Sequence, residues 1–414
     1  MTPVSSPPPP HAIIADTGFE LTPVTQSGRR LGALATRLAT QLGKPAAAND
    51  RTAAFPYAGA QVLRDAGVYA APVPAPLGGL GVESVHDLVV AAGRLAQGDP
   101  ALTIGVNMHM ATVANIARHW RRLEAAGEAR HAEAVAGALT AIARDRSVIA
   151  TAISEPGQDL TRPSASARRT TDGWTLDGRK IFATGSPVAT LLYVSVTYTA
   201  AGGEERYGFA HVPAGADGVV LHDDWDALGM RASGSQSVSF ADVKLPAAAL
   251  RGGFPAGDAR GYMEVYGSAG LFHAAASLGI AEASARGATE AARRFGVPGA
   301  RGRMLLAENA VELSAARATL SRAALLLDAH DGPDADVVAL FGEAQAAKAF
   351  VGQAAERVVT RALELSGGAG YLNGHPLARA YRDVKAGSFM HPLGANRAYD
   401  LIADLVLGRE PELR

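Results

Sequence analysis

The chain has 414 residues, of which 48% are hydrophobic and 19% charged, a composition typical of a globular enzyme and not of a disordered protein. The formal net charge of −1 excludes a global field that would draw the chain to nucleic acid or to acidic lipid. The absence of cysteine excludes disulfides, thiolate catalysis and cysteine-based metal sites.

The first segment of the chain is rich in proline. Residues 1–28 begin with MTPVSSPPPP, and Pro7–Pro10 favour an extended polyproline conformation, so we expect a flexible tail. The segment lacks the basic and apolar regions of a signal peptide. The longest weakly polar stretch, Val265–Ala281, is too short to span a bilayer. The sequence therefore predicts a cytoplasmic protein without membrane insertion.

Residues 29–147 show the three- and four-residue spacing of apolar side chains that is typical of helices. Pro100 suits the first turn of a helix, because proline loses no helical hydrogen bond there. The Pro- and Gly-rich segment Pro74–Gly81 is predicted to be a loop. The expected helices of this N-terminal helical domain are Gly32–Leu42, Tyr57–Ala66, Val85–Ala96, Ala101–Leu123 and Arg130–Ala143.

Residues 148–246 change to short runs rich in β-branched and aromatic residues. Because no helical stretch separates these runs, they favour a middle domain built as an antiparallel barrel or sandwich. The expected strands are Trp174–Gly178, which ends in a turn, Leu191–Thr199, Tyr207–Val212 and Ser235–Phe240.

Residues 247–414 return to a helical pattern with longer helices. Long helices with short connections predict a C-terminal four-helix bundle, and the helical, β, helical order predicts an α+β fold. The expected helices are Tyr262–Arg294, Arg303–Ala329, Asp336–Leu365 and Ala395–Leu407.

Generic catalytic motifs are absent from the sequence. There is no P-loop, HExxH, GxSxG or GxGxxG after a strand, and none of the 11 histidines has the spacing of a metal site, so we expect no metal. The Gly-rich run Ser366–Tyr371 follows an apolar helix. It is either a helix C-cap or a backbone that approaches a ligand closely.

Five segments occur along the chain in a fixed order. They are Val73–Gly81, Ser154–Gly157, Asp177–Gly185, Leu228–Arg231 and Gly367–Tyr371, the last followed by Arg382 and Asp383. In this order the chain resembles the acyl-CoA dehydrogenase superfamily of flavoproteins over residues 30–410. The resemblance implies that family's fold: an N-terminal helical domain, a middle antiparallel β-barrel or sandwich, and a C-terminal four-helix bundle.

The resemblance also implies FAD, with its ring between the β domain and the bundle. The backbone at Ile153 and Ser154 would hydrogen-bond the ring, Phe182 would flank it, and Thr184 would place a hydroxyl near the reactive N5. The alternatives are that Phe182 is a core residue of the β domain and that Thr184 is an ordinary turn residue.

A second group of residues matches the family's contacts to the adenosine half of the cofactor. Arg293 and Phe295 match a pyrophosphate contact, and Glu364, Gly367 and Gly368 form the segment that matches the adenosine contact. In the family this segment crosses a subunit interface, so the resemblance implies a homodimer or homotetramer.

Two departures from the family concern the adenine half of the cofactor. The loop after Gly157 lacks an extra Gly-Ser, and the segment Arg293–Gly296 is followed by a shortened turn. A weaker grip on the adenine half is typical of the superfamily's monooxygenase branch. The alternative cofactor is therefore FMN, or reduced flavin supplied by a reductase.

The family's catalytic carboxylate is missing from the sequence. The position that normally carries a Glu is His391, and residues 384–399 contain no acid. The second place where relatives carry the base corresponds to Ala269.

Two histidines are candidates for the missing chemistry. With a pKa near its usual value of about 6.5, the His391 imidazole would act as a general base near neutral pH. In the monooxygenase branch it would instead hydrogen-bond activated oxygen or the substrate. His109, on a helix, is expected to face the same pocket. The alternatives are that His391 is a loop residue without a chemical role and that His109 only packs its helix against its neighbours.

Taken together, the sequence predicts a flavin-dependent oxidoreductase that transfers hydride from a substrate C–H, as in α,β-dehydrogenation of an acyl thioester, to flavin N5. One alternative is a reduced-flavin-dependent monooxygenase, either a hydroxylase or an N-oxygenase. Another is a catalytically degenerate acyl-binding protein. The expected partners are a small acyl or aromatic molecule, a second copy of the chain, and an electron-transfer flavoprotein or flavin reductase.

Overall fold

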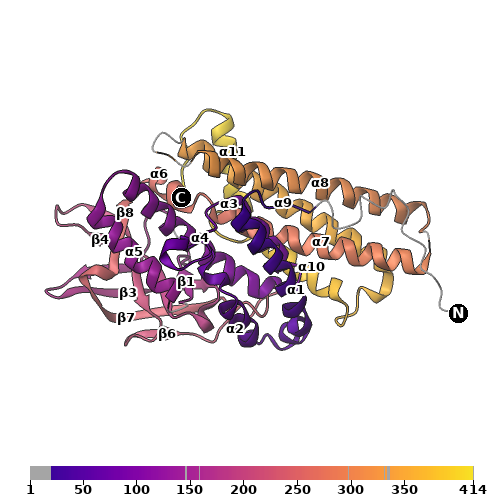
Figure 1. Cartoon of the computed structure of the whole chain (residues 1–414), viewed down its shortest axis with the longest axis horizontal. Coiled ribbons are helices and arrows are strands. Elements are labelled where there is room, and N and C mark those ends of the chain that lie inside the picture. Colours follow the sequence, from indigo (N-terminus) through magenta and orange to yellow (C-terminus); the bar gives the residue numbers. More distant parts are fainter. Residues whose placement is uncertain are drawn as a thin grey trace.

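The computed structural model describes residues 20–144, 147–157, 159–296, 298–330, 332 and 336–413. The sheet lies at one end of the long axis, the long helices of the bundle extend toward the other end, and the N-terminal helices pack against both (Figure 1). No helix in these ranges combines the length and apolar character needed to cross a bilayer.

The N-terminal region is helical, as predicted. The helix around residues 32–42 is longer than expected, because it continues through Pro45 in its interior. Pro100 lies in the first turn of its helix, and the Asp99 carboxylate caps that turn by accepting from the Leu102 N–H at 3.1 Å. The elements are α1 (Gln26–Thr52), α2 (Tyr57–Asp65), η3 (Val68–Ala70), η4 (Ala75–Leu77), α3 (Val85–Ala96), α4 (Pro100–Ala125) and α5 (Ala129–Arg144).

The predicted tail, residues 1–28, is too long at its C-terminal side, while residues 1–19 lie outside the described residues. Thr25 caps α1. The backbone N–H groups of Val24 and Thr25 donate to the buried Asp87 carboxylate at 2.7 and 2.9 Å. These bonds fix the segment before α1 to α3, because a buried carboxylate needs such donors.

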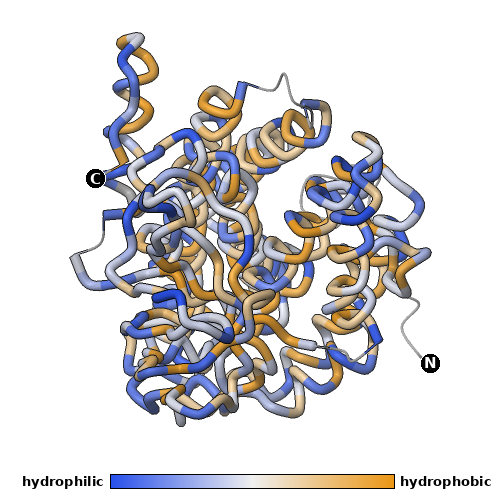
Figure 2. The backbone as a smooth tube through the Cα atoms, turned by 90° about the vertical axis from the view of Figure 1, so that its left-hand side faces the viewer, coloured by the Kyte–Doolittle hydropathy of each residue, from blue (hydrophilic) through white to orange (hydrophobic). Residues whose placement is uncertain are grey.

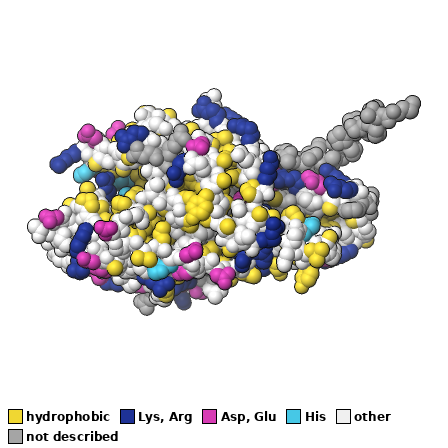
Figure 3. Space-filling model, turned by 90° about the horizontal axis from the view of Figure 1, so that it is seen from below, with side chains coloured by type: hydrophobic (Ala, Val, Ile, Leu, Met, Phe, Trp, Pro, Cys, Tyr) yellow, Lys and Arg dark blue, Asp and Glu magenta, His cyan; other side chains and the backbone are white. Residues whose placement is uncertain are grey.

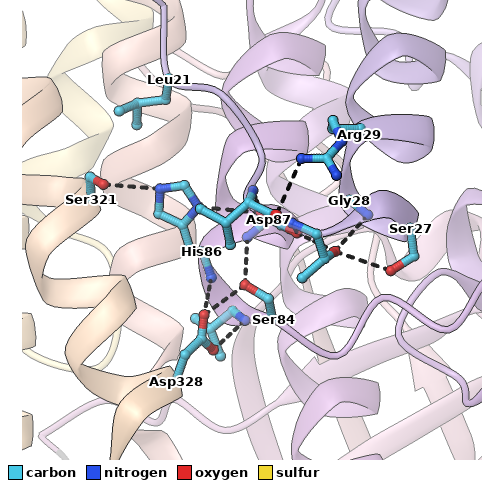
Figure 4. A network of polar contacts seen from close by, with 12 residues as sticks. Leu21, Ser27, Gly28, Arg29, Ser84, His86, Asp87, Ser321 and Asp328 are labelled. Atoms are coloured by element: carbon cyan, nitrogen blue, oxygen red, sulfur yellow. Dashed lines mark hydrogen bonds and ion pairs between the residues drawn. The ribbon is translucent and has the colours of Figure 1, made fainter.

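A neighbouring carboxylate joins α3 to the bundle helix α8 (Ala300–Ala329). Asp328 accepts from the Ser84 hydroxyl at 2.6 Å and from the Val85 and His86 N–H groups at 2.7 and 3.1 Å. His86 Nε2 also lies 3.0 Å from the Ser321 hydroxyl (Figure 4). Asp328 thus acts as an N-cap for α3 that is supplied by another helix.

The middle region is a β domain, as predicted. Its mixed sheet has the strand order β6-β7-β3-β2-β4-β5-β8, most neighbours are antiparallel, and β1 also pairs with β4. The elements are β1 (Ile149–Ala152), β2 (Ser166–Arg169), β3 (Gly173–Ala183), η5 (Ser186–Val188), β4 (Leu191–Thr199), β5 (Glu205–Pro213), β6 (Val219–Leu221), β7 (Gln236–Pro246), η6 (Ala247–Ala249) and β8 (Leu250–Pro255).

Two pairings correct the expectation of a purely antiparallel domain. β1 and β2 both run parallel to β4, β1 beside Leu191–Val194 and β2 beside Thr197–Tyr198. The chain leaves the edge of β4 after β1 and returns to it in the same direction at β2. Sequence patterns could not show this, because the intervening residues carry no helical pattern that would indicate a crossover connection.

The strand expected at Trp174–Gly178 does not end in a turn there. β3 continues through Gly178 to Ala183, with a register shift against β7 at this glycine. Gly178 has a φ of 147°, and an added Cβ would lie 2.5 Å from the Ala165 Cβ. Glycine is needed here to let β3 pass close to the chain that enters β2.

The C-terminal region forms the predicted bundle. The helix expected at Tyr262–Arg294 is two helices, because the chain breaks at Gly267 and Ser268. Hydrophilic and hydrophobic residues alternate along the helices (Figure 2), as expected of helices with one buried face. Besides α8, the elements are α6 (Ala259–Tyr266), α7 (Ala269–Phe295), α9 (Val337–Ser366), η7 (Gly367–Ala369), α10 (Pro376–Asp383), η8 (Val384–Ser388) and α11 (Ala395–Val406).

One core joins the N-terminal helices to the bundle. Its buried residues include Leu88 of α3, Met110 of α4 and Phe272 of α7. α3 crosses α7 so closely that a Cβ added to Gly279 would lie 2.2 Å from the Gly93 carbonyl oxygen. On the outside, basic and acidic side chains are interspersed (Figure 3), in keeping with the low net charge.

Candidate active site

A cavity of about 600 Å³ opens where the β domain meets the helices, and this volume is within the range of ligand pockets. Its walls come from α4, the β1–β2 loop, the end of β3, the β6–β7 connection, the start of α7 and the segment from α10 to α11. Of the predicted site residues, the cavity brings together Ile153, Ser154, Phe182, Thr184 and His391.

A buried ion pair supports the wall at Ile153 and Ser154. Lys180 Nζ lies 2.5 Å from Glu155 Oε1 and 3.3 Å from the Ile153 carbonyl oxygen, and Glu155 also accepts from the Ala165 N–H at 2.9 Å. Burial lowers the pKa of Lys180 to about 8. Burial also raises the pKa of Glu155, but the Lys180 charge and the hydrogen bonds outweigh it and leave that pKa below its usual value. The charged pair therefore fixes the loop beside the cavity.

Phe182 projects into the cavity from a strained backbone. Its φ of 57° lies in the left-handed region, and 55% of its surface is exposed, so the alternative of a core residue is wrong. Its ring meets the Trp225 ring edge-on, with centroids 6.0 Å apart. Thr184 follows, and its hydroxyl accepts from the Ser235 hydroxyl at 3.0 Å. Strain of this kind is maintained where surrounding structure holds a side chain for function.

Sequence reasoning missed that residues 225–230 form the cavity wall beside Phe182, although Leu228–Arg231 is one of the matched segments. Trp225 Nε1 donates to the Met230 carbonyl oxygen at 3.1 Å, which closes this segment into a compact loop. A Cβ added to Gly229 would lie 2.1 Å from the Arg382 carbonyl oxygen. The glycine is therefore required for the loop to touch α10. Leu228–Arg231 and the pair Arg382 and Asp383 are both visible as motifs, but the contact between them cannot be read from the sequence.

His391 stands on the helical side of the cavity. Its Nε2 lies 2.9 Å from the Tyr262 hydroxyl, and its ring meets the edge of Tyr266 with centroids 4.7 Å apart. Burial and the nearby Lys348 charge lower the pKa of His391 to about 3. The expectation of a pKa near 6.5 is therefore wrong, and the imidazole, although neutral at physiological pH, is a weak proton acceptor. It is placed to form hydrogen bonds.

His109 does not belong to the cavity, and the expectation that it faces the pocket is wrong. Its Nε2 lies 2.6 Å from the Tyr69 carbonyl oxygen, and its Nδ1 accepts from the Ile149 N–H at 2.9 Å. Burial lowers the pKa of His109 to about 4. With both nitrogens engaged by backbone, the neutral ring joins α4 to β1 and to the segment before α3.

Two basic side chains near His391 were not predicted. His273, on α7, lines the cavity and is 4% exposed. Lys348, on α9, is 5% exposed, and its Nζ donates to the carbonyl oxygens of Met390 and, at 2.6 Å, Leu393. Both come from apolar helix faces, where a single polar residue gives little signal.

The residues assigned to the adenosine half lie away from the cavity. Arg293 is near the end of α7, a 27-residue helix whose start lines the cavity and whose length is about 40 Å. Glu364 is exposed and pairs with Arg301 at 3.0 Å, and Gly367 and Gly368 follow α9. The Phe295 side chain lies outside the part of the chain that the structure describes. The two predicted groups are therefore not brought together within one protomer.

The cavity fits a flavin. The exposed ring of Phe182 gives a flat wall, and His273 Nδ1, which is buried without a hydrogen-bond partner among the described residues, offers a polar contact to a ligand. Two acids line the cavity: Glu155 is paired with Lys180, and the Asp226 side chain is 93% exposed. Neither is positioned as a free base beside His391.

The sequence matches the acyl-CoA dehydrogenase family in three domains. The N-terminal domain matches residues 25–120, the middle domain residues 150–243, and the C-terminal domain residues 263–396.

Two relatives are amino sugar nitrososynthases. RubN8 of Streptomyces rubradiris is 35% identical, with 94% of this chain and 92% of the relative covered. DnmZ of Streptomyces peucetius is 33% identical, with 96% and 97% covered. Among solved structures, KijD3 in complex with FMN and dTDP-3-amino-2,3,6-trideoxy-4-keto-3-methyl-D-glucose superimposes with a TM-score of 0.85 at 30% identity, covering 94% of this chain and 96% of that chain.

Proposed function

The chain belongs to the acyl-CoA dehydrogenase family and is a flavin-dependent oxidoreductase, and from this premise we propose that it N-oxygenates the amino group of a nucleotide-linked sugar. The relatives support the monooxygenase alternative better than the leading expectation of acyl-thioester dehydrogenation. The proposed cofactor is reduced FMN supplied by a flavin reductase.

One observation carries the proposal. Abstraction of an α-proton from a thioester needs a strong base beside the flavin, and the family uses a carboxylate there. In this chain the position holds His391, whose pKa of about 3 makes it a poor proton acceptor. N-oxygenation needs no carbon acid to be deprotonated, because the amine nitrogen supplies its own lone pair.

The proposed reaction balances in two rounds. In the first, the amine, dioxygen and reduced flavin give the hydroxylamine, oxidised flavin and water. In the second, the hydroxylamine, dioxygen and reduced flavin give the nitroso compound, oxidised flavin and two waters. In each round dioxygen accepts two electrons from the nitrogen and two from the flavin.

The residues of this chain bind and orient the reactants. Phe182 and the loop at Ile153 and Ser154 would hold the ring system, which when bound supplies the electrons. Arg397 lines the same cavity and suits a phosphate group, whereas Arg382, which also lines it, is held in an ion pair with the buried Asp50 carboxylate. His391 would hydrogen-bond the substrate, and the buried Tyr262 hydroxyl 2.9 Å from its Nε2, which stays protonated because burial raises the pKa of Tyr262 well above its usual value, would orient the ring.

The test is a reaction under oxygen-18 with FMN, NADH, a flavin reductase and dTDP-3-amino-2,3,6-trideoxy-4-keto-3-methyl-D-glucose. We expect mass spectrometry to show a nitroso sugar carrying labelled oxygen. Butyryl-CoA with an artificial electron acceptor is the parallel substrate. Desaturation of butyryl-CoA with an unchanged amino sugar contradicts the proposal. Reaction of neither substrate on a flavin-loaded protein supports the acyl-binding alternative.

A further inference from the structure

His273 has a buried ring nitrogen that no described residue of the protein satisfies. It projects from the first turns of α7, lines the cavity, and is 4% exposed. Its Nδ1 is buried and has no hydrogen-bond partner among the described residues. A buried donor or acceptor of this kind is costly unless a ligand or water engages it.

Lys348 places a cation behind this part of the cavity. Its Nζ donates to the Met390 and Leu393 carbonyl oxygens, on both sides of His391. A Cβ added to Gly270 would lie 3.3 Å from Lys348 Cδ, so the missing side chain lets the lysine pack between α7 and the His391 segment. Among the described residues, Lys348 has no acidic partner, and burial lowers its pKa to about 7.

The groups that face His273 are cationic or neutral. Burial, the Lys348 charge and His391 lower the pKa of His273 well below its usual value. Tyr262 and Tyr266, from α6, stay protonated because burial raises their pKa values well above the usual one. This end of the cavity therefore disfavours a positively charged ligand group and offers uncharged hydrogen-bonding partners.

We infer that His273 is a further substrate contact, which hydrogen-bonds the amino group that is oxidised, and that Lys348 in its charged form makes this end of the cavity accept the amine only as the free base. The inference rests on the proposed function. An ammonium ion has no lone pair with which to attack oxygen, so the proton must leave for bulk water before the amine binds. Exclusion of the ammonium ion thus selects the free amine, which is the reactive form.

The test measures binding without turnover, by isothermal titration of the FMN-loaded full chain. The probes are dTDP-3-amino-2,3,6-trideoxy-4-keto-3-methyl-D-glucose and dTDP, which lacks the amine. For the wild type we expect the affinity for the amino sugar, relative to dTDP, to rise about tenfold per pH unit below about pH 7, where Lys348 is charged, and to level off above it. His273→Leu should lose about tenfold to a hundredfold in amino-sugar affinity, with dTDP affinity unchanged.

Three further variants separate contact from structure. His273→Asn keeps hydrogen-bonding groups and should restore part of the affinity. Lys348→Met removes the charge and should flatten the pH dependence. Ser277→Ala, one turn later on α7 and also buried, should bind both probes as the wild type does. Thermal unfolding of each variant verifies that it is folded.

The outcomes distinguish the two proposals. A wild type that neither binds nor oxidises the amino sugar overturns the proposed function and this inference with it. A wild type that oxidises the amino sugar while folded His273→Leu keeps the full affinity difference from dTDP overturns the inference alone. If the ratio of amino-sugar affinity to dTDP affinity in the wild type does not change with pH, the role inferred for Lys348 is overturned.

Discussion

The buried carboxylate of Asp383 accepts a hydrogen bond of 2.6 Å from the backbone N–H of Met230. Met230 has a φ of 51°, which an L-residue rarely adopts, and it ends the loop whose Trp225 ring contacts Phe182. Together with the bond from Arg382 Nη1 to the Leu228 carbonyl oxygen at 3.3 Å, this bond joins α10 to a loop held in an unfavourable conformation and supports the cavity wall.

The first prediction concerns the protonation of Asp383. Burial raises its pKa from 3.8 to about 6, against the opposing hydrogen bond from Met230. The stability that this group contributes is fully present below pH 3.8 and is lost as the pH rises through about 6. Asp383→Asn cannot ionise, so its unfolding free energy relative to wild type should rise over this window, by up to roughly 3 kcal/mol. Urea unfolding at several pH values measures this, and parallel curves for the two proteins contradict it.

The second prediction concerns His391. Because its pKa is about 3, removal of the imidazole should change the rate without removing an inflection near pH 6 to 7. We expect His391→Ala to lose roughly tenfold to a hundredfold in N-oxygenation, the usual cost of a lost buried hydrogen bond, with FMN affinity retained. Tyr262→Phe should have a similar effect. If the rate of N-oxygenation falls at acid pH in the wild type but not in His391→Ala, His391 acts as a general base and the prediction is wrong.

The third prediction concerns the buried pair of Lys180 and Glu155. Lys180→Met leaves the Glu155 carboxylate uncompensated, so we expect a loss of about 3 to 5 kcal/mol in stability and weaker FMN binding. Lys244→Met, which removes an exposed lysine 2.6 Å from Asp242 on the same sheet, is the control and should lose less than about 1 kcal/mol. Urea unfolding and FMN fluorescence titration measure both effects. Equal losses in the two variants argue against a special role for the buried pair.

The fourth prediction separates strain from binding at Phe182. Phe182→Gly should gain about 1 kcal/mol in stability, because glycine adopts a φ of 57° freely, and should bind FMN more weakly. Ala53→Gly changes a residue with a φ of 54° at the end of α1 and should gain stability without affecting FMN. Calorimetry and flavin titration test the pair. Unchanged FMN affinity in Phe182→Gly contradicts the assignment of this ring to the flavin wall.

The fifth prediction concerns the run after α9. A Cβ added to Gly368 meets nothing within 4 Å, so Gly368→Val should fold normally. If the cofactor is FMN, which lacks the adenosine half, the variant should keep its flavin affinity. Loss of flavin from a folded variant, together with a dimer or tetramer in light scattering, would instead show FAD held across a subunit interface.

Much of the fold could be predicted from the sequence, because helix periodicity and short β-rich runs are local signals. Phe182 and Thr184 were located because they belong to a contiguous motif. Trp225 and His273 were missed because each reaches the cavity only through contacts between distant segments. His109 was misplaced because a histidine among apolar residues on a helix gives no indication of which neighbouring segment its nitrogens meet.

The crossing of α3 and α7 at Gly93 and Gly279 has a consequence for synthesis on the ribosome. At about 5 to 20 residues per second, on the order of ten seconds or more separates the emergence of these two helices. During that interval the face of α3 that carries Val89 and Gly93 lacks its partner α7. A nascent chain at this stage is therefore a substrate for chaperones that bind apolar segments, and release must await the bundle.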